Sequence, residues 1–302
     1  MRGSVREDHG RGPDGAGDEG PRSVRRLDDP LGPKGFLEAL GVSAAERFRR
    51  LVAYRTLIKY LVLKEIKVKS RGTLFGVAWT LINPLFTIIV YYVIFRHIFR
   101  VGIPNFLAFF LLGFLMWVFF SRAATTAATC IHDNENIVKR SAFPLEVLPL
   151  TVVLYHLFHH VIALGLALPL MVALWGAKFS WHLLWVGGLV AAFAGFTLAV
   201  ALWLATIGVF FRDTRDILEV VLPMLFWATP IFYSPAMAPP FLQPLLKANP
   251  LSSFIGAMRA VVLAGQAPSA SEVGWMVLWL SVALTSGVWV FVRYWPRFAE
   301  ES

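Results

Sequence analysis

Long apolar runs, separated by short polar segments, limit the folds open to this chain more than any other feature. The runs at 106–128 and 183–211 contain no Asp or Glu, and each exceeds the roughly 20 residues that a helix needs to cross a bilayer. Each run is apolar almost all round, whereas the strands of a membrane β-barrel alternate apolar and polar residues. Only 16% of the 302 residues are charged, against about 25% in soluble domains. The sequence therefore predicts an all-α polytopic membrane protein.

Six transmembrane helices are expected from these runs. They cover about Leu74–Phe95, Phe106–Ala128, Leu150–Trp175, Leu183–Phe211, Ile217–Tyr233 and Gly274–Val292. Before the last span, residues 236–265 form two apolar pieces, about Met237–Lys247 and Leu251–Leu263, that are split by Asn249-Pro250. Each piece is too short to cross, and such irregular backbone at membrane depth must be buried in protein, so a re-entrant hairpin is expected there. The transmembrane domain is thus predicted over 74–297.

Two segments precede the first span. Residues 1–45 are rich in Gly, Pro, Arg and Asp, and we expect a disordered cytoplasmic tail. Residues 46–73 are expected to form an amphipathic helix. One face carries Tyr54, Leu57, Ile58, Leu61 and Val62, and the other carries Arg55, Lys59 and Lys67. A basic amphipathic helix beside a span is typical of the membrane interface.

Basic residues near the span ends are distributed unequally between the two sides of the membrane. One side has 12, namely Arg55, Lys59, Lys64, Lys67, Lys69, Arg71, Lys139, Arg140, Arg212, Arg215, Arg293 and Arg297, and the other has 5, namely Arg96, Arg100, Lys178, Lys247 and Arg259. Because basic loops stay in the cytoplasm, both termini are placed there and the 236–265 hairpin on the outer side. The same bias accounts for the net charge of +9 without nucleic acid, for which no motif is present.

The polar segment between the second and third spans, at 132–149, has the features of a docking element. Its first part, Asn136–Arg140, is short, amphipathic and basic at its end. Phe143-Pro144 then stops any helix, because proline clashes with the preceding turn and restricts the residue before it. A second short piece, Leu145–Leu148, is expected to end at Pro149. A rigid element at a membrane face indicates that a soluble partner protein binds there and controls the chain.

The chain lacks an internal energy source. No Asp or Glu occurs between Leu74 and Ile131 or between Leu150 and Phe211, whereas ion-coupled transporters use intramembrane carboxylates. No GxxxxGK[ST] phosphate loop and no G-x-S-x-G nucleophile elbow is present. A transporter subunit therefore fits better than a membrane glycosyltransferase or acyltransferase, for which Asp213 and Asp216 are the only compact candidates. A channel is a third alternative, marked by conductance that needs no ATP.

A few polar and aromatic side chains inside the spans are candidates for function. Arg122 can meet an anionic head group that enters from the cytoplasm, or it reaches the interface or pairs with Asp133 or Glu219. His156, His159 and His160 share one helix face, but no carboxylate or cysteine lies nearby in sequence, so a polar contact or proton relay is favoured over a metal. The aromatic residues of the second span can stack on sugars, although most are expected to face lipid or pack in the bundle.

The docking segment, one earlier stretch and three later landmarks carry a family resemblance. NENIVKRSAFPLEVLPL (134–150) resembles the coupling segment of type-2 ABC permeases that export polysaccharides, with matches at Asn136, Ile137, Val138, Lys139, Phe143, Pro144, Glu146, Leu148 and Pro149. FFRDTRDI (210–217), TPIFYSP (229–235) and NPL (249–251) are similar to later motifs of that family, and LKEIKVKSRGTLFGVAWTLINPL (63–85) to its opening. The resemblance covers about residues 50–297.

The resemblance implies a homodimer of permeases in the cytoplasmic membrane of a bacterium, served by two ATPase subunits that bind ATP and Mg, while this chain binds no cofactor or metal. The transported substrate would be a lipid-linked polysaccharide such as O-antigen, capsule, galactan or teichoic acid. Three sets of residues then receive expected roles. The ATPase-coupling set is Asn136, Ile137, Val138, Lys139, Arg140, Phe143, Pro144 and Glu146; the cytoplasmic channel entrance is Arg122, Arg212, Asp213, Arg215 and Asp216; and the outer gate is Pro230, Tyr233, Asn249, Pro250 and Arg259. The nearest alternative is a drug or lipid exporter of the same class.

Overall fold

Helices form the whole fold in the part of the chain that the computed structural model describes, which is residue 49 and residues 52–70, 79–98, 102–135, 144–175, 180–295 and 298. The helices, in chain order, are α2 (Arg55–Ser70), α3 (Trp79–Val93), α4 (Phe106–Thr129), α6 (Val147–Trp175), α7 (Leu184–Phe210), α8 (Thr214–Trp227), α9 (Gln243–Ala248), α10 (Pro250–Arg259) and α11 (Ala270–Tyr294). Two π-helical turns, Ile94–Ile98 and Ala260–Ala264, continue α3 and α10. The all-α prediction is confirmed for these residues.

Four helices are long and apolar enough to cross a membrane: Phe106–Thr129, Val147–Ala173, Trp181–Phe210 and Ala270–Tyr294. They correspond to the second, third, fourth and sixth predicted spans. The helices in the other two positions are shorter, with 15 residues in α3 and 14 in α8. At 1.5 Å per residue, α8 is only about 21 Å long. The chain is therefore a multi-pass membrane protein, and six crossings remain a prediction.

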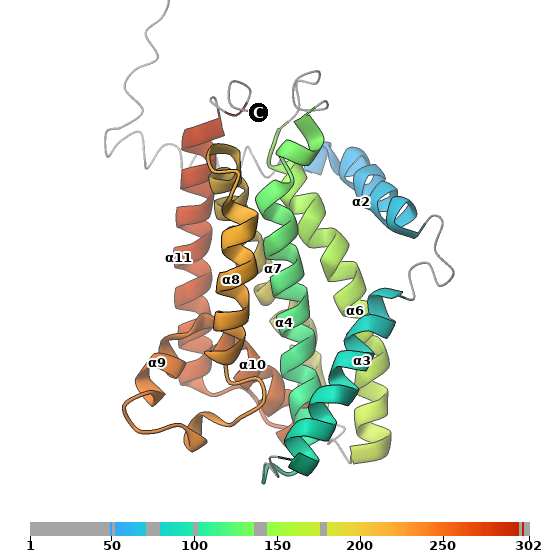
Figure 1. Ribbon diagram of the computed structural model, residues 1–302, viewed down its shortest axis with the longest axis vertical. Coiled ribbons are helices and arrows are strands. Elements are labelled where there is room, and N and C mark those ends of the chain that lie inside the picture. The colour runs from blue at the N-terminus through green and yellow to red at the C-terminus, as the bar shows by residue number, and fades with distance from the viewer. Residues whose placement is uncertain are drawn as a thin grey trace, which may run out of the picture.

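The long helices pack side by side, and their two ends differ (Figure 1). At one end lie α2, the last turns of α4, α7 and α11, and the first turn of α6; we call this the docking end. At the opposite end lie α9, α10, the beginning of α4 and the end of α3. The α2 helix lies across the docking end and packs its apolar stripe against α6, with Leu61 only 6% exposed. This packing agrees with the predicted amphipathic helix.

Three predicted boundaries are wrong. The fifth span was expected to reach Tyr233, but α8 ends at Trp227, because Pro230 disfavours helix at the residue before it. The first hairpin piece was expected from Met237, but α9 begins only at Gln243. Pro149 was expected to separate a short piece from the third span, but α6 already begins at Val147. Proline is tolerated in a first helical turn because an N–H there has no helical partner.

Small residues let α7 approach its neighbours closely. A Cβ added to Gly287 of α11 would lie 2.5 Å from the carbonyl oxygen of Ala199 in α7. Gly208 of α7 is pressed in the same way against the backbone of Ala128 at the end of α4. Helices in lipid depend on such close packing, because lipid tails are as apolar as the side chains they would replace.

Replacing Gly287 by Ala is expected to destabilise the protein by about 1–3 kcal/mol, because the added methyl group forces α11 away from α7. Gly274→Ala in the same helix is the matched control, since nothing lies within 4 Å of a Cβ there. Thermal unfolding of the detergent-purified variants measures the difference. Equal melting temperatures for the two variants would show that the close approach is unimportant.

Candidate functional site

The second half of the predicted coupling segment is part of a buried core at the docking end. Leu145, Val147 and Leu148 are at most 5% exposed. They pack with Leu61 of α2, Cys130 and Ile131 after α4, Leu202 and Ala205 of α7, and Phe291 and Phe298 at the end of the chain. We call these ten residues the docking-end core. These contacts join the segment, which continues into α6, to α2, α7, α11 and the end of α4.

Only part of the predicted ATPase-coupling set is described. Pro144 and Glu146 are half-buried beside the docking-end core. Asn136, Ile137, Val138, Lys139, Arg140 and Phe143 lie outside the described residues. Leu145 is buried, whereas its neighbours Pro144 and Glu146 are half-buried. In this short stretch, Leu145 therefore points into the docking-end core and its two neighbours point partly away from it.

The residues predicted for the channel entrance all lie at the docking end, on α4 and around the start of α8. Arg212, Asp213 and Asp216 are exposed, and Arg215 forms an ion pair with Glu219 at 3.4 Å. With both side chains about 60% exposed, that pair contributes little to stability. Asp216 in the first turn of α8 faces the positive end of the helix dipole.

Arg122 of α4 is half-buried and interacts electrostatically with Tyr155 of α6. The expected ion pair with Asp133 or Glu219 does not form. Glu219 is paired with Arg215, and Asp133 accepts a hydrogen bond from Thr129 Oγ1 at 2.7 Å. Arg122 thus sits between two helices at the docking end, which leaves the predicted contact with an anionic head group open to it.

The histidines of α6 make contacts inside the bundle. His156 Nε2 shares a hydrogen bond of 3.1 Å with Thr126 Oγ1 of α4. The ring of His160 stacks on Phe119 with 5.0 Å between ring centroids. The hydrogen bond of His156 is a polar contact of the kind favoured for the triplet, and a proton relay stays a prediction. The described residues contain no group of three metal-ligating side chains.

The five predicted outer-gate residues come together around the loop that follows α8. The guanidinium of Arg259, at the end of α10, donates from Nη1 to Pro230 O (2.7 Å), from Nη2 to Ile231 O (2.6 Å) and from Nε and Nη2 to Phe109 O (3.2 and 3.0 Å). Its central carbon also lies 3.3 Å from the centroid of the Phe109 ring. We call this set of contacts the hairpin joint.

Asn249 completes the hairpin joint from the other side. Its Oδ1 accepts from the N–H of Leu251 (2.9 Å) and caps α10, while its Nδ2 donates to Thr229 Oγ1 (3.0 Å). Pro250 occupies the first position of α10, where its missing N–H costs nothing. Tyr233 donates to Trp227 O (3.3 Å) across the same loop. The structure thus shows these residues holding backbone in place, and a gating role for them stays a prediction.

Sequence reasoning identified Arg259 and Pro230 but missed the partners Phe109 and Ile231. Phe109 lies one turn into α4, and Gly113 one turn further leaves room for the guanidinium, since a Cβ at that position would lie 2.7 Å from Nη2. The single glycine between bulky side chains in Leu112-Gly113-Phe114 was the available signal.

An aromatic groove of about 320 Å³ lies between α3, α4 and α8. It is lined by Tyr91, Phe114, Trp117, Ser121, Leu222, Pro223, Phe226 and Trp227. Most aromatic rings of α4 pack inside the bundle, as expected. Two rings that line the groove from other helices are more accessible: Trp227 of α8 is 53% exposed and Tyr91 of α3 is half-buried. The face of α8 beside the groove also exposes Val220, Val221 and Met224.

Replacing Arg259 by Met is expected to destabilise the protein, because the carbonyls of Phe109, Pro230 and Ile231 lose their shared donor. Each buried group left unpaired costs about 1–3 kcal/mol. Arg259→Lys retains the charge but not the fork of donors, so it should recover only part of the loss. Lys247→Met, which removes an exposed cation from the same hairpin, is the control. Melting temperatures that do not distinguish Arg259→Met from this control would contradict the prediction.

Comparison with known proteins confirms the family resemblance. A family model described as ABC-2 type transporter matches residues 56–263. The O-antigen export system permease protein RfbA of Myxococcus xanthus is 33% identical over 254 residues, which are 83% of this chain and 97% of that protein. Two proteins of the same name from Klebsiella pneumoniae are 29% and 30% identical over 212 residues, 69% of this chain and 81% of theirs. The chain therefore belongs to the ABC-2 type transporter family, as a multi-pass membrane subunit of a transporter.

Proposed function

We propose that this chain is the permease subunit of an ATP-driven exporter that moves a lipid-linked polysaccharide across the cytoplasmic membrane of a bacterium. The relatives named as O-antigen export permeases support the substrate class. The observation that carries the mechanism is the docking-end core, which joins the coupling segment to five helices. The related drug or lipid exporters are not favoured, because the relatives match over most of the chain and all carry the O-antigen name.

The energy for export would come from a separate ATPase that binds ATP and Mg and contacts the coupling segment. Asn136–Phe143 would supply the contact surface, with Lys139 and Arg140 facing acidic groups of the ATPase. Leu145, Val147 and Leu148 would transmit the movement, because all three are buried in the docking-end core and α6 begins at Val147. Both termini and the docking end would then lie in the cytoplasm, which the excess of basic residues at that end supports.

A conducting path for a glycan needs a surface that tolerates hydroxyl groups without binding them tightly. The aromatic groove offers ring faces, on which the apolar faces of sugars can stack, together with the hydroxyl of Ser121. The exposed apolar face of α8 lies beside it. In a homodimer with two ATPases, two such faces would enclose the path, with Arg122 at its cytoplasmic entrance and the α9–α10 hairpin at its outer end.

Charge reversal of the basic pair, Lys139→Glu with Arg140→Glu, is expected to reduce ATPase co-purification and polymer export several-fold. Lys139 and Arg140 precede the docking-end core in the sequence. The double variant therefore tests binding of the ATPase without removing a side chain of that core. Lys247→Glu, which reverses an exposed cation on the α9–α10 hairpin, is the control and should leave both quantities unchanged. Normal export by the double variant in cells lacking the wild-type gene would overturn the docking assignment.

Removing one exposed ring from the aromatic groove tests whether the groove is part of the path that conducts the glycan. Trp227→Ala is expected to slow export several-fold, while Trp227→Tyr should restore most of it because a ring face is kept. Trp185→Ala removes a comparably exposed indole from α7, outside the groove, and should have no effect. Export is measured as surface polymer per permease molecule. Equal export by the two alanine variants would exclude the groove from the path.

A further inference from the structure

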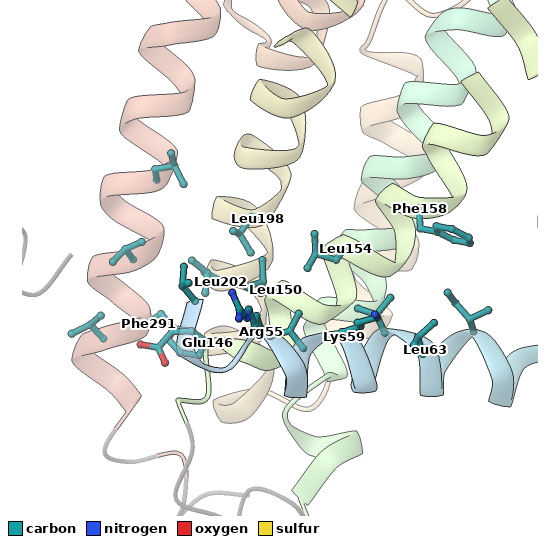
Figure 2. Close-up of a pocket in the computed structure, with 17 residues that line it drawn as sticks. Arg55, Lys59, Leu63, Glu146, Leu150, Leu154, Phe158, Leu198, Leu202 and Phe291 are labelled. Atoms are coloured by element: carbon teal, nitrogen blue, oxygen red, sulfur yellow. The ribbon is translucent and has the colours of Figure 1, made fainter. Parts of the chain in front are cut away.

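A second groove, of about 820 Å³, lies beneath α2 at the docking end and is separate from the aromatic groove (Figure 2). We call it the interface groove. Its walls are aliphatic side chains from four helices, such as Val62 of α2, Leu154 of α6, Leu198 of α7 and Val288 of α11. Its volume falls within the roughly 300–1,000 Å³ of ligand pockets. An aliphatic groove of this size in a membrane protein accommodates hydrocarbon chains.

The position of the groove points to the bilayer. In Figure 2, α2 lies across the lower parts of the membrane helices, with Arg55 and Glu146 at one end of the groove and Leu63 and Phe158 at the other. Leu63 and Phe158 are 44% and 45% exposed. Apolar edges of this kind are unfavourable in water but favourable against acyl chains. The groove therefore opens toward lipid at the level of the head groups.

The charges of α2 favour a lipid with an anionic head group. The helix carries five basic residues and one acidic residue, Glu65. Two of the basic residues, Arg55 and Lys59, line the groove through their aliphatic stems, and both side chains are exposed, so their charged ends reach the interface. Neither forms an ion pair among the residues that the structure describes. Glu146 lines the groove as well, so the groove itself has an excess of one positive charge.

We propose that the interface groove binds an anionic phospholipid of the leaflet that contains α2. One acyl chain lies between α2, α6, α7 and α11, and the phosphate lies between Arg55 and Lys59. Because Glu146 and Leu150 form part of the wall, the bound lipid lies against the beginning of α6, beside the direct contacts between α2 and α6. The site depends on the membrane location of the chain and not on which substrate the transporter carries.

Photo-labelling of the full-length chain tests the proposal. The protein is reconstituted in nanodiscs containing phosphatidylglycerol with a diazirine in one acyl chain, and labelled peptides are mapped by mass spectrometry. We expect labelling of the stretches of α2, α6, α7 and α11 that line the groove. Lys59→Gln is expected to lower the preference for phosphatidylglycerol over phosphatidylcholine about fivefold, the effect of one basic residue at an anionic surface. Lys64→Gln, on the same helix but outside the groove, should not change it.

A second pair of variants tests binding of the acyl chain in the groove separately from binding of the charged head group. Leu154→Trp fills the groove and is expected to abolish labelling, whereas Leu166→Trp, on an exposed face of α6, should leave it intact. Labelling that is unchanged by both Lys59→Gln and Leu154→Trp would overturn the site. Cross-linking of the groove to residues 1–48 of the chain, or protection by a polyprenyl-linked glycan but not by phosphatidylglycerol, would assign it to another occupant and equally overturn the proposal.

Discussion

A backbone that stops being helical inside a bundle of membrane helices must find new partners for its carbonyl groups, and at the end opposite α2 Arg259 meets that requirement for the loop after α8. Residues 228–242 leave the helix after α8, and the carbonyls of Pro230 and Ile231 turn inward. One guanidinium binds both, together with the carbonyl of Phe109. Lipid offers no alternative donors, so each of these groups would otherwise be unpaired. Arg259 thus ties the loop after α8 and the end of α10 to α4, in addition to the apolar packing of α10 in the core.

The docking end is held by a different interaction, the burial of aliphatic and aromatic side chains. Leu145, Val147 and Leu148 are in contact with residues from α2, α7 and α11 as well as the end of α4. Apolar packing has no directional preference, but it is dense, and a dense core moves as a unit. At the end opposite α2 the hairpin joint adds directed hydrogen bonds to apolar packing, whereas the docking end is held mainly by undirected contacts.

The sequence was sufficient for elements that depend on local patterns and insufficient for those set by contacts between distant residues. The runs at 106–128, 150–175, 183–211 and 274–292 predicted four helices closely, because length and apolarity decide them. The ends of α8 and α9 were missed, since Pro230 and the hairpin joint override the apolar pattern there. Arg259 was singled out by its position, but its binding to three carbonyls joins residues about 30 to 150 positions apart, which no local pattern encodes.

The two π-helical turns distinguish the two ends of the molecule. Ile94–Ile98 and Ala260–Ala264 both lie toward the end opposite α2, where α3 and α10 finish. A π turn holds one extra residue per turn with poorer hydrogen bonding, so it bends more easily than the α-helix around it. No such turn interrupts α4, α6, α7 or α11 in the described residues. A bend at that end is therefore easier in α3 and α10 than in α4, α7 or α11, while α6 has its own candidate bend at Pro169.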